Sequence, residues 1–285
     1  LQLQTLAEPA RIEWPQGESF RLAGQAGLKQ LSVSVRQSRD WFSLNGEVSL
    51  DGGQVLNMQR LLDLVGQGQS RFVQLDDGRF LALTDAFRKR LADLNALAET
   101  HVKDRRIHSL AAPLLEDLAE EAGEFVSDQA WRERIARLRA AEDLQPVLPS
   151  NLQAELRDYQ IEGYNWLARL AHWGVGACLA DDMGLGKTLQ ALALMLNRAP
   201  DGPSLVIAPT SVCMNWHSET TRFAPTLNVQ VLGAGDRQKQ VETLGPMDLL
   251  LCSYALLQQD SVGDLLSDKI WRTIVLDEAQ AIIIM

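Results

Sequence analysis

Short, continuously apolar runs alternate with helical patterns in the second half of the chain, after residue 150. A strand that is buried on both faces of a parallel sheet has this uniform apolar character, whereas a half-exposed strand alternates apolar and polar residues. We therefore expect an α/β fold of the doubly wound class, whose ligands bind at the carboxyl ends of the strands. The expected strands are Ala177–Ala180, Ser204–Ala208, Asn228–Leu232, Leu249–Cys252 and Thr273–Leu276.

The first half of the chain has a different pattern. Apolar and polar residues alternate from Leu31 to Arg36, which predicts a strand. Asn45-Gly46 and Asp77-Gly78 are favoured hairpin turns, and each lies between short strand-like runs. The expected hairpins cover Trp41–Leu50 and Arg71–Leu83, and the expected helices are Leu56–Gly66, Asp85–Ala98 with Thr84 as its cap, Leu110–Leu118 and Trp131–Ala141. This mixture predicts a smaller α+β unit.

Pro146 and Pro149 mark the change between the two patterns, because proline ends a helix and starts a connecting segment. We expect an accessory α+β domain over residues 1–145 and an α/β domain over residues 150–285. A length of 285 residues suits about two domains.

A glycine-rich stretch from Ala180 to Thr188 precedes an apolar helical run. Gly184 and Gly186 lack Cβ atoms, so the backbone N–H groups can curl around an anion, and the helix directs its positive dipole end to the same place. Lys187 offers a cation for the β- and γ-phosphates, and Thr188 offers a hydroxyl for Mg²⁺. The stretch predicts a phosphate-binding loop, although the strict pattern has glycine where this chain has Asp181.

Two acidic residues, Asp277 and Glu278, directly follow the last expected strand. An apolar strand that ends in paired acids is used by nucleotide hydrolases to hold Mg²⁺ and to orient water. By itself, the pair of acidic residues is explained equally well by the N-terminal cap of a helix. Together with the loop about ninety residues upstream, it predicts one catalytic site with Asp277 at Mg²⁺ and Glu278 as the base for water.

Composition and charge argue against an autonomous nucleic-acid-binding protein and against a membrane-spanning one. The net charge is −10, and residues 150–285 carry 9 lysines and arginines against 15 acidic residues, so neither half has the basic excess of an autonomous nucleic-acid binder. No apolar run approaches ~18 residues, so we expect no membrane span. The three cysteines are isolated in apolar stretches, which favours reduced thiols in a cytoplasmic protein.

Five motifs, in order, resemble those of the Swi/Snf family of helicase-like ATPases in superfamily II. Asp182–Thr188 resembles motif I, and Asp277–Gln280 resembles motif II, a DEAQ box with Gln280 where many relatives have histidine. The other three are Leu156–Gln160 with Gly163 and Trp166 (the adenine-recognition motif), Val206–Val212 with Asn215, Trp216 and Glu219 (motif Ia), and Leu250–Tyr254 (the next strand-end motif). The first half is more loosely similar to the segment that precedes the ATPase core in bacterial members.

The resemblance implies that residues 150–285 are lobe 1 of a two-lobed RecA-like core. Such a core uses ATP and Mg²⁺ to move on double-stranded DNA and remodels DNA-bound protein complexes, here at the nucleoid of a bacterial cytoplasm. By the family pattern, Gln160 reads the adenine. Nucleotide contacts are implied for Asp181, Asp182, Met183, Gly184, Leu185, Gly186, Lys187 and Thr188, and contacts toward the DNA backbone for Pro209, Thr210, Ser253 and Tyr254.

The chain begins at Leu1 and ends at Met285, a few residues after motif II, so we expect it to be part of a longer polypeptide. Ile283-Ile284-Met285 depart from the family, which has a Lys-Asn pair there. The implied second lobe would supply an arginine for the transition state, so the 285 residues alone are expected to bind nucleotide without efficient turnover. Two alternatives stay open: a non-hydrolysing, nucleotide-responsive binding module, and another class of phosphate-loop ATPase.

Overall fold

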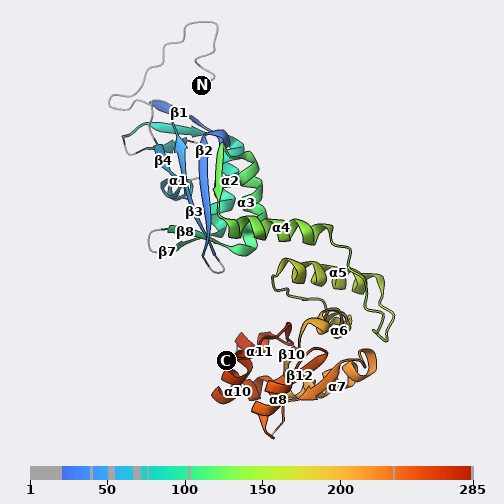
Figure 1. Cartoon of the computed structure of the whole chain (residues 1–285). Helices are drawn as coiled ribbons and strands as arrows, with labels where there is room; N and C mark the ends of the chain where they lie inside the picture. The colour runs from blue at the N-terminus through green and yellow to red at the C-terminus, as the bar shows by residue number, and fades with distance from the viewer. Residues whose placement is uncertain are drawn as a thin grey trace. The chain divides into compact units, whose positions relative to one another are not determined.

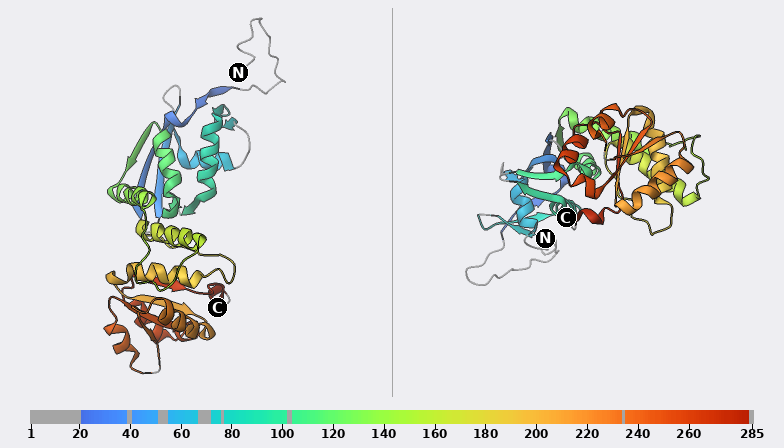
Figure 2. Two further views of the ribbon diagram at one scale, coloured as in Figure 1. Left: turned by 90° about the vertical axis from the view of Figure 1, so that its right-hand side faces the viewer. Right: turned by 90° about the horizontal axis from the view of Figure 1, so that it is seen from below.

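A computed structural model describes residues 21–38, 41–50, 55–66, 72–75, 77–101, 104–233 and 235–283. The chain divides into two compact units, Leu1–Leu138 and Arg139–Met285, and the boundary lies within helix α4 (Gln129–Asp143), before the two prolines (Figures 1 and 2). Independent folding of residues 1–145 and 150–285 stays a prediction. Among the described residues no helix has the length and apolar character that crossing a bilayer requires.

The first unit contains two sheets covered by helices. The larger sheet has the order β7-β8-β3-β2-β9, with β4 paired to β3, and the smaller has the order β1-β6-β5. The larger sheet comprises β2 (Leu31–Ser38), β3 (Trp41–Ser49), β4 (Val55–Asn57), β7 (Ala98–His101), β8 (Asp104–His108) and β9 (Glu124–Ser127). The smaller comprises β1 (Leu22–Ala26), β5 (Phe72–Gln74) and β6 (Phe80–Leu83), and the helices are α1 (Met58–Gly66), α2 (Asp85–Leu97) and α3 (Ala112–Glu121), with 3-10 turns at Leu28–Gln30 and Ser109–Ala111.

Several expectations for this unit are confirmed. The predicted strand near Leu31 is β2, with its apolar residues buried, and β5 and β6 form the predicted antiparallel hairpin. Gly78 has φ +77°, and the Thr84 hydroxyl accepts the Phe87 N–H at 3.3 Å and so caps α2. The sequence Asp51-Gly52-Gly53 also predicts a turn, but it lies outside the described residues.

The hairpin predicted at Asn45-Gly46 is wrong, because β3 is one continuous strand from Trp41 to Ser49. Gly46 pairs with Val33 in the middle of the antiparallel β2–β3 ladder. A Cβ at position 46 would lie 2.8 Å from the carbonyl oxygen of Ser32 and 3.1 Å from the terminal methyl of Met58. Glycine therefore serves close packing there rather than a turn.

The second unit is an α/β fold, as predicted. Its four strands are all parallel and have the order β11-β12-β10-β13. The strands are β10 (Ser204–Ala208), β11 (Asn228–Val231), β12 (Asp248–Ser253) and β13 (Thr273–Leu276). The helices are α5 (Asp158–Trp173), α6 (Lys187–Arg198), α7 (Thr210–Phe223), α8 (Arg237–Thr243), α9 (Tyr254–Leu257), α10 (Asp260–Ser267) and α11 (Gln280–Ile283), with a 3-10 turn at Ala199–Asp201.

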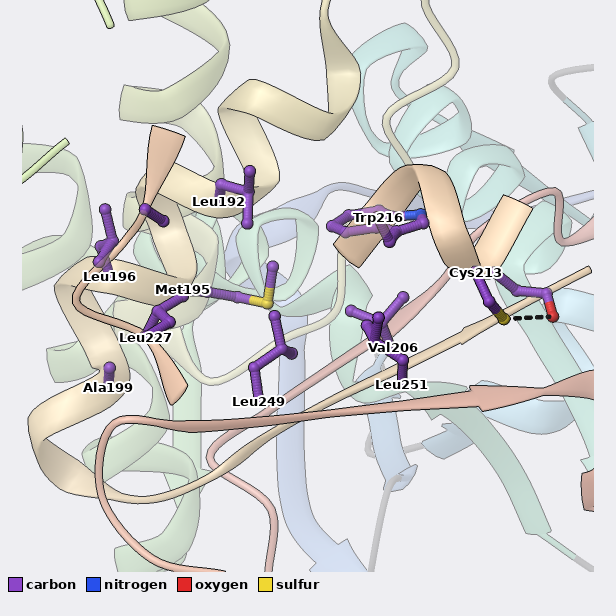
Figure 3. Packing of buried hydrophobic residues seen from close by; sticks show 12 residues of the cluster. Leu192, Met195, Leu196, Ala199, Val206, Cys213, Trp216, Leu227, Leu249 and Leu251 are labelled. Atoms are coloured by element: carbon purple, nitrogen blue, oxygen red, sulfur yellow. Dashed lines mark hydrogen bonds between the residues drawn. The ribbon is translucent and has the colours of Figure 1, made fainter. Parts of the chain in front are cut away.

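Two apolar cores cover the two faces of this sheet. Val206 of β10 and Leu249 of β12 pack with residues of α6 and α7 on one face (Figure 3), while Leu205 and Leu250 pack with residues of α8, α9 and α10 on the other. Every residue of β10 is buried for this reason. The uniform apolar pattern was therefore interpreted correctly for the central strands.

Two predicted strands differ from the structure. Residues Ala177–Ala180 form no strand and are largely exposed, since none of the four described strands pairs with them. The strand at Thr273–Leu276 forms, but it is not buried: Ile274 and Leu276 are 55% and 46% exposed. Being at the edge of the sheet, β13 is covered on one face only, and its Val275 packs against the α6 side.

Candidate functional site

The glycine-rich loop leads directly into α6, whose first residue is Lys187. Gly184 and Gly186 have φ values of +82° and +74°, in the left-handed region that only glycine enters at little cost. The Leu189 and Gln190 N–H groups donate the first main-chain bonds of the helix, both to the Gly186 oxygen, so the N–H of Thr188 precedes these bonds and points out of the N-terminus. Glycines in this conformation before a helix N-terminus are compatible with anion binding, and the phosphate-binding loop stays a prediction.

The side chain of Gln160 forms a hydrogen bond with this loop. Its side chain is buried, its Nε2 donates to the carbonyl oxygen of Leu185 at 3.1 Å, and its Oε1 accepts from the backbone N–H of Arg157 at 2.9 Å. The Tyr159 hydroxyl also donates to the Leu185 oxygen, at 3.3 Å. A Cβ at Gly186 would lie 2.4 Å from Gln160 Nε2. The side chain expected to read an adenine therefore binds the loop through its Nε2 and the start of its own helix, α5 (Asp158–Trp173), through its Oε1.

Lys187 lies half-buried over the same loop, and its Nζ donates to the carbonyl oxygens of Asp181 at 2.6 Å and Asp182 at 3.0 Å. These are main-chain bonds, which an ammonium group can exchange for bonds to phosphate oxygens. Met183, in the same loop, is 85% exposed. The structure thus places a cation at the mouth of the loop.

Asp277 follows β13 and is held at four atoms. Its N–H donates to the Ile207 oxygen at 2.9 Å, and its own oxygen accepts from the Tyr254 hydroxyl at 2.9 Å. Its carboxylate accepts from the Glu278 N–H at Oδ1 (3.0 Å) and from the indole Nε1–H of Trp216 at Oδ2 (2.8 Å). The carboxylate of this candidate metal ligand is therefore fixed before any ligand arrives.

Glu278 has φ +52°, one of two positive φ values among non-glycine residues that the structure describes. This conformation is uncommon and costs on the order of 1 kcal/mol or more, and such backbone strain concentrates at functional sites. The Gln280 side chain donates to Glu278 Oε2. Glu278 is half-buried, so its carboxylate can reach water.

The run of α6 along β13 brings the two halves of the site together. Arg198, at the end of α6, donates to Thr273 Oγ1 at 3.0 Å, and Val275 packs against the cluster that contains Leu192. The helix therefore runs antiparallel to the strand. From Arg198 back to Lys187 is about 17 Å at 1.5 Å per residue, and from Thr273 on to Asp277 is about 13 Å at 3.3 Å per residue. The loop and the acidic pair thus lie at the same end.

These residues fit a magnesium nucleotide. A threonine hydroxyl and a carboxylate are the hard oxygen ligands that Mg²⁺ prefers. Each oxygen of Asp277 accepts one bond already, but a carboxylate has about four acceptor positions, so both oxygens retain a position for a ligand.

A hollow of about 640 Å³ lies beside the loop, between α5 and residues Cys178–Asp181. Tyr159 and Trp166 line it and are 37% and 42% exposed. Two partly exposed aromatic rings next to a phosphate loop offer a flat apolar surface of the kind on which a base stacks. Gln160 is not among the lining residues.

The four residues predicted to face DNA all follow strands at the carboxyl edge of the sheet, but they differ in accessibility. Thr210 begins α7 and is exposed, and Pro209 is half-buried. Ser253 is buried and its hydroxyl caps α9 by accepting the Leu256 N–H. Tyr254 is 5% exposed with its hydroxyl bonded to Asp277, and burial, followed by the charges of Asp277 and Glu278, raises its pKa. Burial of the Ser253 and Tyr254 side chains does not favour a contact with DNA, and the DNA contacts of all four residues stay predictions.

The role of Trp216 and of the Tyr254 hydroxyl at Asp277 was not predicted. These residues lie 61 and 23 positions from their partner, and no local pattern reports such a pairing.

Comparison with known proteins finds similar proteins for the second half of the chain. Residues 159–283 match the SNF2-related domain. A Bacillus subtilis protein named "Putative ATP-dependent helicase/translocase YwqA" is 44% identical over 56% of this chain, and the human chromatin-remodeling ATPase INO80 is 39% identical over 51% of it. The chain spans 18% and 10% of those two proteins. A solved structure of the Sulfolobus solfataricus SWI2/SNF2 ATPase core in complex with dsDNA is 44% identical, with a TM-score of 0.44 over 49% of this chain and 29% of that one. Residues 159–283 therefore form an SNF2-related domain.

Proposed function

We propose that this chain provides the ATP-binding lobe of an ATP-dependent translocase that acts on double-stranded DNA and remodels DNA-bound protein complexes. The family supports an ATPase domain, since the similar curated proteins are named as ATP-dependent helicase/translocase and chromatin-remodeling ATPases. The observation that carries the proposal is the antiparallel run of α6 along β13, which brings the phosphate loop and Asp277 to one end of the sheet.

Each site residue has a role in this proposal. Lys187 binds the β- and γ-phosphates, Thr188 and Asp277 hold Mg²⁺, and Glu278 orients the attacking water and accepts its proton. Mg²⁺, when bound, neutralises charge on the phosphate oxygens. The exposed aromatic rings of Tyr159 and Trp166 provide the surface for the adenine.

The DNA surface is proposed at the carboxyl edge of the sheet, with Thr210 as its most accessible residue. Residues 150–285 have an excess of acidic side chains, 15 against 9 basic ones, so we expect this lobe to bind DNA weakly and with strong salt dependence. We further propose that the parent is a DNA-dependent ATPase of the bacterial cytoplasm.

We also propose that the 285 residues alone bind ATP but turn it over poorly. The sequence resemblance implies an arginine from a second lobe, and such a residue is worth about 10³–10⁵ in rate in phosphate-loop enzymes.

The nucleotide site is tested by calorimetric titration of the chain with ATP and Mg²⁺. Lys187→Ala should weaken binding at least tenfold. Lys239→Ala, which removes the same charge from the exposed surface of α8, should leave the affinity unchanged. Equal affinities for wild type and Lys187→Ala would refute the role of Lys187.

Turnover is tested by steady-state phosphate release with and without duplex DNA. Glu278→Gln supplies the blank. Turnover that DNA stimulates and that Glu278→Gln abolishes would refute the proposed inactivity of the isolated chain, while supporting the catalytic assignment of Glu278.

A further inference from the structure

The carboxylate of Asp277 is oriented by side chains from two other elements of the fold. Trp216 lies on α7, and its indole Nε1–H donates to Asp277 Oδ2 at 2.8 Å. Tyr254 follows β12, and its hydroxyl donates to the main-chain oxygen of Asp277 at 2.9 Å. One bond fixes the side chain and the other fixes the main chain of the same residue.

The Trp216 ring cannot easily turn away from this bond. It is 3% exposed and packs in the core between α6 and the sheet, with Leu192, Val206 and Leu251 in the same cluster (Figure 3). A close-packed core holds a large ring in one orientation. The direction of the indole N–H is therefore set by packing and not by Asp277.

The bond at Oδ2 also has a consequence for Oδ1. With Oδ2 held by the indole, Oδ1 lies where it accepts the N–H of Glu278 at 3.0 Å. Glu278 has the unusual φ of +52°, and this local bond helps to keep its backbone in that conformation. The contact of Trp216 thus extends through Asp277 to the proposed base.

We propose that Trp216 and Tyr254 are positioning residues of the metal site: they fix Asp277 for Mg²⁺ and, through it, the backbone of Glu278. The proposal rests on the proposed nucleotide site. Neither ring touches the nucleotide, and both act through Asp277. Groups that orient a metal ligand in this way influence metal affinity strongly, typically by about 10- to 100-fold.

The chain offers a matched control in Trp271. Its indole Nε1–H also donates a hydrogen bond at 2.8 Å, but to the carbonyl oxygen of Leu266 and not to Asp277. Trp216→Phe and Trp271→Phe therefore remove the same group. Tyr254→Phe removes only the hydroxyl, keeps the ring, and provides a second variant if Trp216→Phe does not fold.

The first measurement needs no nucleotide. Amide hydrogen exchange of Glu278, followed by NMR on the 285-residue chain, should accelerate at least fivefold in Trp216→Phe and in Tyr254→Phe, and should stay unchanged in Trp271→Phe. Unchanged exchange at Glu278 in both test variants would overturn the proposal.

The second measurement is the Mg²⁺ concentration for half-maximal ATP binding. It should rise roughly tenfold or more in Trp216→Phe, while the affinity for ATP in EDTA changes less than twofold. Equal weakening with and without Mg²⁺ would assign Trp216 to general packing and overturn the positioning role. If the wild type bound no ATP under either condition, the proposed function would fail, and the exchange measurement would still decide whether Trp216 and Tyr254 hold Asp277.

Discussion

Replacing Gln160 by alanine separates two roles that this side chain can have at the nucleotide site. The sequence resemblance assigns it to the adenine. In the structure both ends of its amide are bonded, at 3.1 Å to the Leu185 oxygen and at 2.9 Å to the Arg157 N–H. We predict that Gln160→Ala weakens the binding of any phosphate ligand, with or without a base.

The magnitude follows from the one bond that the loop loses, from Gln160 Nε2 to the Leu185 oxygen. A neutral hydrogen bond contributes about 0.5–1.5 kcal/mol net. Leu185 keeps its bond from the Tyr159 hydroxyl, at 3.3 Å, so its oxygen is not left without a donor. A loss of about 0.5–1.5 kcal/mol in the free energy that holds the loop corresponds to roughly 2- to 13-fold in affinity.

The assay compares ATP with inorganic tripolyphosphate, which has the same phosphates and no base. Both should lose affinity by the same factor in Gln160→Ala. Gln240→Ala is the control, because its Nε2 also binds a carbonyl oxygen, that of Val231 at 3.2 Å, away from the loop. A weakened affinity for ATP with unchanged affinity for tripolyphosphate would refute the reasoning and restore Gln160 to the adenine.

Three further predictions concern stability, reactivity and domain structure. Gln190 is fully buried, and neither its amide nitrogen nor its amide oxygen has a hydrogen-bond partner in the described chain. Gln190→Leu should therefore raise the free energy of unfolding of the second unit by about 1–3 kcal/mol, measured by denaturant unfolding. A lower free energy of unfolding would show that the amide has a partner. Burial raises the pKa of the Cys252 thiol to about 11 and also raises that of Cys213, while Cys178 is exposed. One thiol of the wild type should therefore react with a disulfide reagent at pH 8, and no thiol should react in Cys178→Ser. Rapid reaction of two thiols would contradict the burial of Cys213 and Cys252. Limited proteolysis should cut first between 143 and 152, near the 77% exposed Val147, and leave two resistant pieces, whereas a first cut within 154–280 would argue against two domains.

The sequence predicted best those features that depend on neighbours in the chain. The uniform apolar runs located β10 and β12, and the order of glycines, Lys187 and Thr188 located the start of α6. Thr84 was recognised as a cap because capping is a contact over three residues.

Features that depend on distant partners were not predicted. Asn45-Gly46 reads as a turn, but the glycine serves contact with Met58 and with the Ser32 backbone. The apolar run of β13 does not report that its strand lies at an edge. The sequence resemblance implied a DNA contact for Tyr254, and only the three-dimensional structure shows that its hydroxyl binds Asp277.

The edge position of β13 has a consequence for the thermodynamics of the site. Asp277 and Glu278 follow a strand whose place in the described sheet rests on one neighbour, β10, so this strand can detach locally while β10, β11 and β12 stay paired. A nucleotide that binds only the attached form raises the free energy of this opening by about 2.7 kcal/mol at a concentration of 100 Kd. ATP would then keep this one strand attached. Its binding energy appears as a higher free energy of local opening of β13, with little change in the global stability of the sheet.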